Sequence, residues 1–197
     1  MGKNEIGISW TIKGFENRGF KVEKYNIPIS TINIVAGTLT ILSIIVWITV
    51  CRLLWGHVFF PTSLISATIY VAIMIVLHEL LHAIGFTIRR RIKWKGSIKF
   101  GFNLNRLFCY CIYLKPLPLI DYLIGALFPF AVLGIGLFVI SIIIGSKLLL
   151  LASICNFLAC TGDLMLFHLA VKKYPSLILE HPTDVGFIAL YEQHVDQ

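Results

Sequence analysis

Four runs of apolar residues, each long enough to cross a lipid bilayer, dominate the sequence. The runs are Ile29–Leu54, Pro61–Ile88, Leu119–Ile144 and Leu148–Val171. A transmembrane helix needs roughly 20 consecutive apolar residues, and each run meets that length. The pattern predicts an all-α polytopic membrane protein with about four transmembrane helices. Residues 29–173 would form one membrane domain, flanked by cytoplasmic tails over residues 1–28 and 174–197.

The segments outside these runs are polar and carry turn residues. In the N-terminal tail, Gly14, Gly19 and Pro28 separate short alternating stretches, which indicates a loop or a small strand pair. The tail shows no short apolar core, so we expect no cleavable signal peptide. After the second run, residues 95–102 and 107–114 alternate and are rich in aromatic side chains. They predict a small β-hairpin, with an interfacial loop as the alternative. A hairpin at the membrane surface would let an extended peptide add as a further strand.

The composition supports a membrane protein, and the charges give its orientation. Of the 197 residues, 57% are hydrophobic and 14% are charged, and the mean hydropathy is +0.85. Basic residues gather before the first run, between the second and third, and after the fourth, whereas only Arg52 and Lys147 lie in the other two loops. Under the positive-inside rule, both termini lie in the cytoplasm. Topology and contact with anionic headgroups account for the net charge of +7, and we expect no nucleic-acid binding.

The five cysteines show neither a disulfide nor a zinc-binding pattern. They are Cys51, Cys109, Cys111, Cys155 and Cys160, and none belongs to a CxxC pair. Cys109 and Cys111 lie on the predicted cytoplasmic side, where thiols stay reduced. We expect small buried side chains, without disulfides and without a structural zinc at Cys109 and Cys111.

The second run contains the most informative motif, His78-Glu79-Leu80-Leu81-His82. On a helix, this HExxH spacing puts both imidazoles on one face, about one turn apart, which suits a single Zn²⁺. The glutamate beside the first histidine is then placed to take a proton from water at the metal. Three ionisable side chains inside an apolar run are costly to keep, so the motif predicts a functional site within the membrane.

A hydrolytic zinc site needs a third protein ligand at matching depth. The candidates are Asp121, Asp163, His168 and Glu180. Asp163 lies eight residues from the cytoplasmic end of its run, which is roughly 12 Å at 1.5 Å per residue. His82 and His78 lie six and ten residues from the end of theirs, so Asp163 falls between them in depth. An aspartate in an apolar helix also needs a cation or a donor nearby. We therefore predict His78, His82 and Asp163 as metal ligands and Glu79 as the catalytic base.

Three further residues of the fourth run are candidates for supporting roles. Asn156 lies two turns before Asp163 on the same face, which suits contact with an oxyanion or with substrate. The alternative is a polar contact between helices. His168 is a candidate for a contact behind a metal ligand, the alternative being a partly buried imidazole near the interface. Gly162 is expected to let two helices approach closely.

These residues resemble a family of small bacterial four-helix membrane proteins described as putative zincin peptidases. The matching features are HELLHAIGF at 78–86, KFGF at 99–102, Phe128-Pro129, Gly162-Asp163 and HPTDVGF at 181–187, within about residues 55–191. The chain is more broadly similar to site-2-protease-type intramembrane metalloproteases, although its NFLACTGDL segment lacks their Pro-rich segment and LDG motif. The resemblance implies Zn²⁺ at His78, His82 and Asp163, and Glu79 as the base. It also implies a membrane protein or peptide as substrate and a location in the bacterial cell membrane.

Other functions fit only parts of the pattern. A non-proteolytic metal-binding membrane regulator, or an immunity protein against a peptide toxin, would keep the metal site but would not need Glu79. A chance HExxH motif in a structural bundle would leave the depth-matched aspartate unexplained. A glutamate as third ligand is disfavoured, because no glutamate follows Glu79 within the apolar runs. The leading hypothesis is a zinc-dependent membrane-embedded peptidase that acts near the cytoplasmic face.

Overall fold

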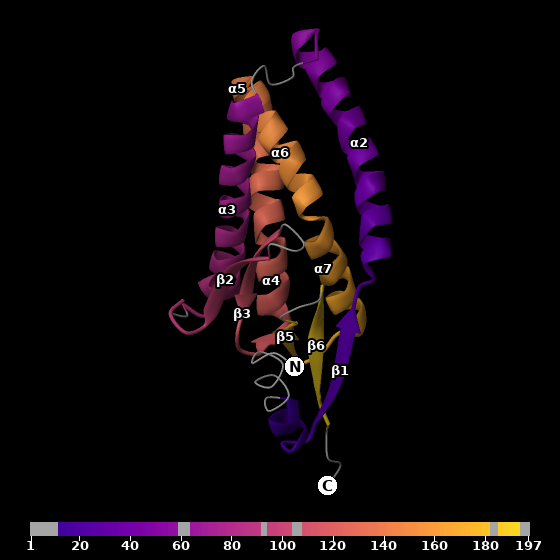
Figure 1. The fold of residues 1–197 in the computed structure, drawn as a ribbon, viewed down its shortest axis with the longest axis vertical. Coiled ribbons are helices and arrows are strands. Elements are labelled where there is room, and N and C mark those ends of the chain that lie inside the picture. Colours follow the sequence, from indigo (N-terminus) through magenta and orange to yellow (C-terminus); the bar gives the residue numbers. More distant parts are fainter. Residues whose placement is uncertain (1–11, 59–63, 92–93, 104–107, 182–184, 194–197) are drawn as a thin grey trace.

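In a computed structural model, the chain forms a bundle of long helices with two small β-sheets toward one end (Figure 1). The structure describes residues 12–58, 64–91, 94–103, 108–181 and 185–193. The elements are β1 (Phe20–Asn26), α2 (Ile29–Trp55), α3 (Leu64–Ile88), β2 (Ile98–Asn103), β3 (Phe108–Tyr113), β4 (Leu117–Pro118), α4 (Leu119–Pro129), the π-helical segment η1 (Phe130–Gly136), α5 (Leu137–Ile144), α6 (Lys147–Ala159), α7 (Thr161–Lys173), β5 (Leu177–Glu180) and β6 (Gly186–Glu192). The fold is therefore mainly helical, as predicted, but it also contains a four-stranded and a two-stranded sheet, so it is not all-α.

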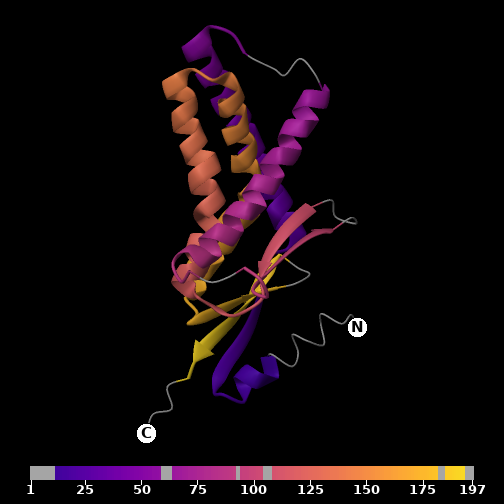
Figure 2. The same ribbon diagram turned by 90° about the vertical axis from the view of Figure 1, so that its left-hand side faces the viewer.

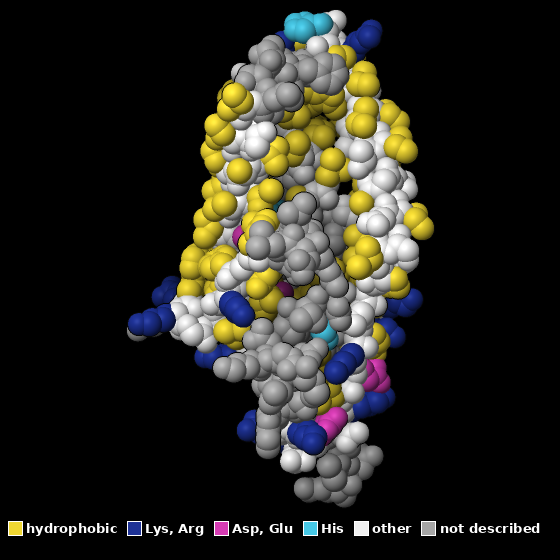
Figure 3. All heavy atoms as spheres, in the orientation of Figure 1, with side chains coloured by type: hydrophobic (Ala, Val, Ile, Leu, Met, Phe, Trp, Pro, Cys, Tyr) yellow, Lys and Arg dark blue, Asp and Glu magenta, His cyan; other side chains and the backbone are white. Residues whose placement is uncertain are grey.

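The helices agree with three of the four predicted runs and divide the fourth. Among the described residues, Ile29–Trp55, Thr68–Ile88 and Leu119–Ile144 are helical stretches long and apolar enough to cross a membrane. The fourth run consists of α6 and α7, which bend by 48° and count as one further span if they cross together. Hydrophobic side chains cover much of the helical surface in Figure 3, and large ones such as Ile34 and Ile143 are exposed. This apolar surface is compatible with a membrane protein.

The third predicted run is continuous, but its helical geometry changes in the middle. α4 ends at Pro129, and η1 leads from there into α5. A proline has no N–H to bond to the carbonyl four residues earlier, and π-helical turns bond five residues back. Such π-helical turns are frequent at functional sites. The apolar pattern did not predict this change.

The hairpin predicted after the HExxH helix is confirmed. β2 and β3 pair antiparallel, with Ile98 opposite Tyr113 and Gly101 opposite Tyr110. A side chain at Gly101 would collide with the Tyr110 ring, because an added Cβ would lie 2.2 Å from it. The hairpin lies beside α3 in Figure 2, and residues 104–107 at its tip are outside the described residues.

The two segments predicted as tails pair with each other in a four-stranded antiparallel sheet, which the sequence analysis missed. The strand order is β1-β6-β5-β4. In the central strand β6, Phe187 and Ala189 belong to a core with residues of α3, α4 and α7, whereas Ile188 and Leu190 pack with side chains of residues 12–15. A strand buried on both faces reads as a continuous apolar run, which periodicity does not distinguish from a helix.

Candidate metal centre

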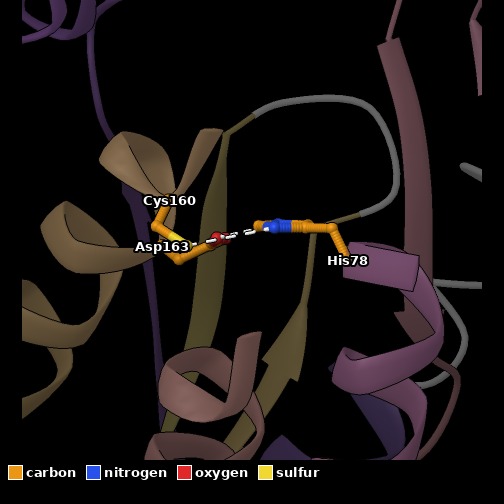
Figure 4. Close-up of side chains that lie close together, drawn as sticks. All are labelled: His78, Cys160 and Asp163. Atoms are coloured by element: carbon orange, nitrogen blue, oxygen red, sulfur yellow. Dashed lines mark hydrogen bonds and ion pairs between the residues drawn. The ribbon is translucent and has the colours of Figure 1, made fainter. Parts of the chain in front are cut away.

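The polar side chains of α3 and α7 meet inside the bundle. His78 Nε2 lies 3.2 Å from Asp163 Oδ2, His82 Nε2 lies 3.4 Å from the same oxygen, and the two Nε2 atoms are 3.2 Å apart. Figure 4 shows His78 of α3 and Asp163 of α7 facing each other. We call these three atoms the ligand triangle. The structure thus brings together all three residues predicted as metal ligands.

Hydrogen bonds on the far side of each imidazole determine where its proton lies. His82 Nδ1 is 2.9 Å from the Gly125 carbonyl, which only accepts, so Nδ1 carries the hydrogen. Asn156 Nδ2 donates to the Pro129 carbonyl at 3.1 Å, which turns its Oδ1 toward His78 Nδ1 at 2.9 Å. His78 Nδ1 therefore also donates. In both rings, Nε2 presents its lone pair to the ligand triangle.

The ligand triangle has the geometry and the chemistry of a zinc site. Three electron-pair donors that face one another at 3.2 to 3.4 Å repel unless a proton or a metal cation lies between them. Asp163 Oδ2 is buried and finds no hydrogen-bond donor among the described residues. In tetrahedral zinc sites with bonds of about 2.0 Å, ligand atoms lie about 3.3 Å apart. Two imidazoles and one carboxylate fit Zn²⁺.

The bend between α6 and α7 places Asp163 at the start of α7, facing His78 and His82. Cys160 separates the two helices, so Asp163 lies in the first turn of α7. A helix N-terminus carries a partial positive charge, which stabilises a carboxylate there. The Asp163 side chain is 22% exposed, whereas both histidine side chains are 9% exposed, so the site is most open on the side of the aspartate. Gly162 does not provide the predicted close approach, because an added Cβ would meet nothing within 4 Å.

Two glutamates border the free edge of β3, next to the ligand triangle. Leu114 N–H donates to Ser97 in the hairpin, so N–H groups of odd-numbered residues of β3 point away from β2. The Glu79 carboxylate lies near Cys111 N–H, and Glu180 Oε2 accepts a hydrogen bond from Tyr113 N–H at 2.5 Å. Burial raises the pKa of Glu180 to about 7, although the Tyr113 N–H opposes that change. Glu79 is close enough to His78 and His82 to interact electrostatically with both.

The remaining candidates from the sequence have other partners. Asn156 is buried against His78 and Pro129, which corresponds to the interhelical alternative and not to a free oxyanion contact. His168 is exposed on α7, which differs from the predicted partly buried imidazole, and its role behind a metal ligand stays a prediction. Asp121 is buried and pairs with Arg89 Nε at 3.0 Å and Arg90 Nε at 2.5 Å.

Cys160 was predicted only as a small buried side chain, but it lies at the candidate metal centre. Its Sγ belongs with His78 and Asp163 to a group whose ligand atoms lie within 4.8 Å of one another (Figure 4). Sγ also accepts a hydrogen bond from Asn156 Nδ2 at 3.4 Å. Its position three residues before Asp163 was the available signal. Cys109 and Cys111 are free thiols, and burial raises the pKa of each.

Comparison with known proteins gives one family. A family model described as "Putative zincin peptidase" matches residues 71–179, which is more than half of the chain and includes the whole ligand triangle. No curated protein and no solved structure shows significant similarity to the chain.

Proposed function

The chain belongs to the putative zincin peptidase family, and from this premise we propose that it is a zinc-dependent, membrane-embedded peptidase. Its substrates are membrane or juxtamembrane peptides, which it hydrolyses near the cytoplasmic face. The observation that carries the proposal is the ligand triangle with Glu79 beside it. A site that only stores a metal does not need a carboxylate at this place.

The membrane location rests on the helices and on the distribution of charge. α2, α3 and the stretch from α4 to α5 are long and apolar enough to span a bilayer. Arg89, Arg90 and Arg91 follow α3 directly, and His82 lies six residues before its end, about 9 Å at 1.5 Å per residue. Cationic loops face the cytoplasm. The site is therefore shallow and close to cytoplasmic water.

The chemistry follows from the donor set. Zn²⁺ at the ligand triangle would supply a Lewis acid that polarises a carbonyl and lowers the pKa of water toward neutrality. Glu79 accepts the proton of the attacking water and passes it to the leaving amine. His78 and His82 hold their lone pairs toward the metal, and Asp163 adds a negative charge that offsets part of the cation's charge.

The free edge of β3 supplies a place for the substrate. Its outward N–H groups at Cys111 and Tyr113 lie beside the site, the first near Glu79 and the second bonded to Glu180. An extended peptide that adds to this edge bonds to both groups and replaces the bond to Glu180. A substrate helix has to unwind first, because helical carbonyls are already bonded.

The decisive experiment compares membrane peptides from cells that produce the wild type or Glu79→Gln. The variant should retain zinc and lose cleavage by at least 10²-fold, the usual contribution of a general base. Glu192→Gln, which changes an exposed glutamate of β6, is the matched control and should behave as the wild type. Full cleavage by Glu79→Gln would refute the mechanism. Zinc without Glu79-dependent peptides would favour the non-proteolytic regulator or immunity protein.

The ligand assignment has a separate test. His78→Ala and Asp163→Ala each remove one corner of the ligand triangle, so zinc measured in the purified variants should fall well below one ion per chain. Zinc retained by Asp163→Ala at the wild-type level would refute the assignment of that residue.

A further inference from the structure

We propose that Pro129 is a positioning residue of the metal centre, because its missing N–H leaves the Gly125 carbonyl to orient His82, and because its own carbonyl orients Asn156 behind His78. The inference rests on the proposed zinc centre and is independent of whether the protein cleaves peptides. It gives a role to Pro129 of the Phe128-Pro129 motif, which has no part in the proposed chemistry.

The contact with His82 depends on what Pro129 lacks. In an α-helix, the N–H of residue 129 would bond to the carbonyl of residue 125. Proline has no N–H, and the next N–H, of Phe130, bonds to Leu127. The Gly125 carbonyl is thus left to accept the Nδ1–H of His82 at 2.9 Å.

Two glycines bring α3 close enough for that bond. An added Cβ at Gly85 would lie 2.8 Å from Gly125 Cα, and one at Gly125 would lie 1.9 Å from the Phe86 ring. Neither position accepts a side chain unless the helices separate. The close approach and the free carbonyl therefore occur at the same place, one turn from His82.

The contact with His78 runs through Asn156. η1 begins directly after Pro129, and its wider turns alter the hydrogen bonding of the helix here. The Pro129 carbonyl accepts from Asn156 Nδ2, and this fixes which end of the amide faces His78. A carbonyl cannot donate, so the amide oxygen must face Nδ1 and the ring must carry its hydrogen there.

Both contacts have the same consequence for the metal. Each ring is held in the tautomer that presents the Nε2 lone pair to the ligand triangle. The other tautomer would point an N–H at the cation. Partners behind metal-bound histidines typically change metal affinity by roughly 10- to 100-fold when they are removed.

A merely structural role for Pro129 predicts a different result. Proline inside a helix is unfavourable, so replacing it with alanine in a plain helix raises stability. Here, Pro129→Ala adds an N–H that competes with His82 for the Gly125 carbonyl. We expect zinc affinity to fall by roughly 10-fold or more, while the Tm of the metal-free protein stays the same or rises.

The experiment measures zinc affinity with a competing chelator, and the Tm of the metal-free protein, on the full chain in detergent. Asn156→Leu removes the acceptor for His78 and should weaken zinc by roughly 10- to 100-fold. Asn156→Asp keeps an oxygen facing His78 and should bind zinc more tightly than Asn156→Leu. Ser153→Ala is the matched control, because Ser153 Oγ also donates to a carbonyl of this run, that of Gly134 at 2.8 Å, and this bond involves neither histidine.

The outcomes separate this inference from the proposed function. Wild-type protein that binds no zinc would overturn the proposed function. Wild-type zinc affinity in Pro129→Ala would overturn the role of Pro129 and leave the zinc centre intact. If Pro129→Ala does not fold, the comparison of Asn156→Leu with Asn156→Asp decides. Equal zinc affinities of these two variants would overturn the inference. So would a loss of zinc affinity in Ser153→Ala as large as that in Asn156→Leu.

Discussion

Glu180 gives the protein a pH-dependent stability that can be measured without any substrate. Burial raises the pKa of Glu180 to about 7, from an ordinary value of 4.5. Between these two values, the folded chain holds a proton that the unfolded chain releases. On account of this residue, stability is therefore greatest below about pH 4.5, falls as the pH rises to about 7, and changes little above that pH.

The size of this effect follows from the two pKa values. A carboxyl group with a pKa of about 7 when folded and 4.5 when unfolded costs up to ~3 kcal/mol of folding free energy once it is ionised. For a chain of this length, that corresponds to a difference in Tm on the order of 6–12 °C. Glu180→Gln removes the ionisation and keeps an oxygen that can accept from Tyr113 N–H.

The assay is thermal unfolding of metal-free protein in detergent at pH 5 and pH 8. The Tm of Glu180→Gln should lie close to that of the wild type at pH 5 and exceed it much more at pH 8. The control is Glu23→Gln on β1, because a hydrogen bond from Lys21 lowers the pKa of Glu23, and its titration lies below this window. If the Tm of the wild type and that of Glu180→Gln fall by the same amount between pH 5 and pH 8, burial does not raise the pKa of Glu180 as argued.

Two further predictions test the packing around the site. Gly125→Ala places a methyl group 1.9 Å from an aromatic ring of α3, so it should lower the free energy of unfolding by about 1–3 kcal/mol and weaken zinc binding. Gly134→Ala is the control, because its added methyl group has its nearest neighbour at 3.5 Å, and it should change neither stability nor zinc binding. Replacing both Arg89 and Arg90 with Gln removes both cations that pair with the buried Asp121 among the described residues. The double variant should cost about 3–5 kcal/mol, more than Asp121→Asn, and the zinc content should be unchanged in either variant.

Long apolar runs made the helical part of the fold predictable, and short strands escaped prediction for physical reasons. A span is defined by about 20 residues of uniform character, which one sequence displays plainly. β6 has the sequence GFIALYE and is buried on both faces, so it shows no alternation. Its partner β1 lies more than 150 residues earlier, and no local signal links them. The hairpin was predictable because its two strands are neighbours in sequence.

At the site, the sequence predicted the groups that bear charge but not the groups that orient them. His78, His82 and Asp163 were found because ionisable residues in apolar helices are costly and their depths can be compared. The contacts behind the histidines depend on the Gly125 and Pro129 carbonyls, and backbone groups carry no signature in a sequence. Asn156 was noticed, but its direction depends on the neighbouring helix.

The two irregular places in the helices, the change from α4 to η1 and the bend between α6 and α7, both lie at the candidate metal centre. At membrane depth, an unpaired backbone group has no water to bond with, so irregular backbone persists only where protein groups satisfy it. The change from α4 to η1 supplies carbonyls that accept from His82 and Asn156, and the bend at Cys160 exposes a helix N-terminus that receives the charge of Asp163. Each irregularity is offset by a side chain of the site, and each orients that side chain in return. A variant that straightens either helix should therefore disturb zinc binding even if it packs better.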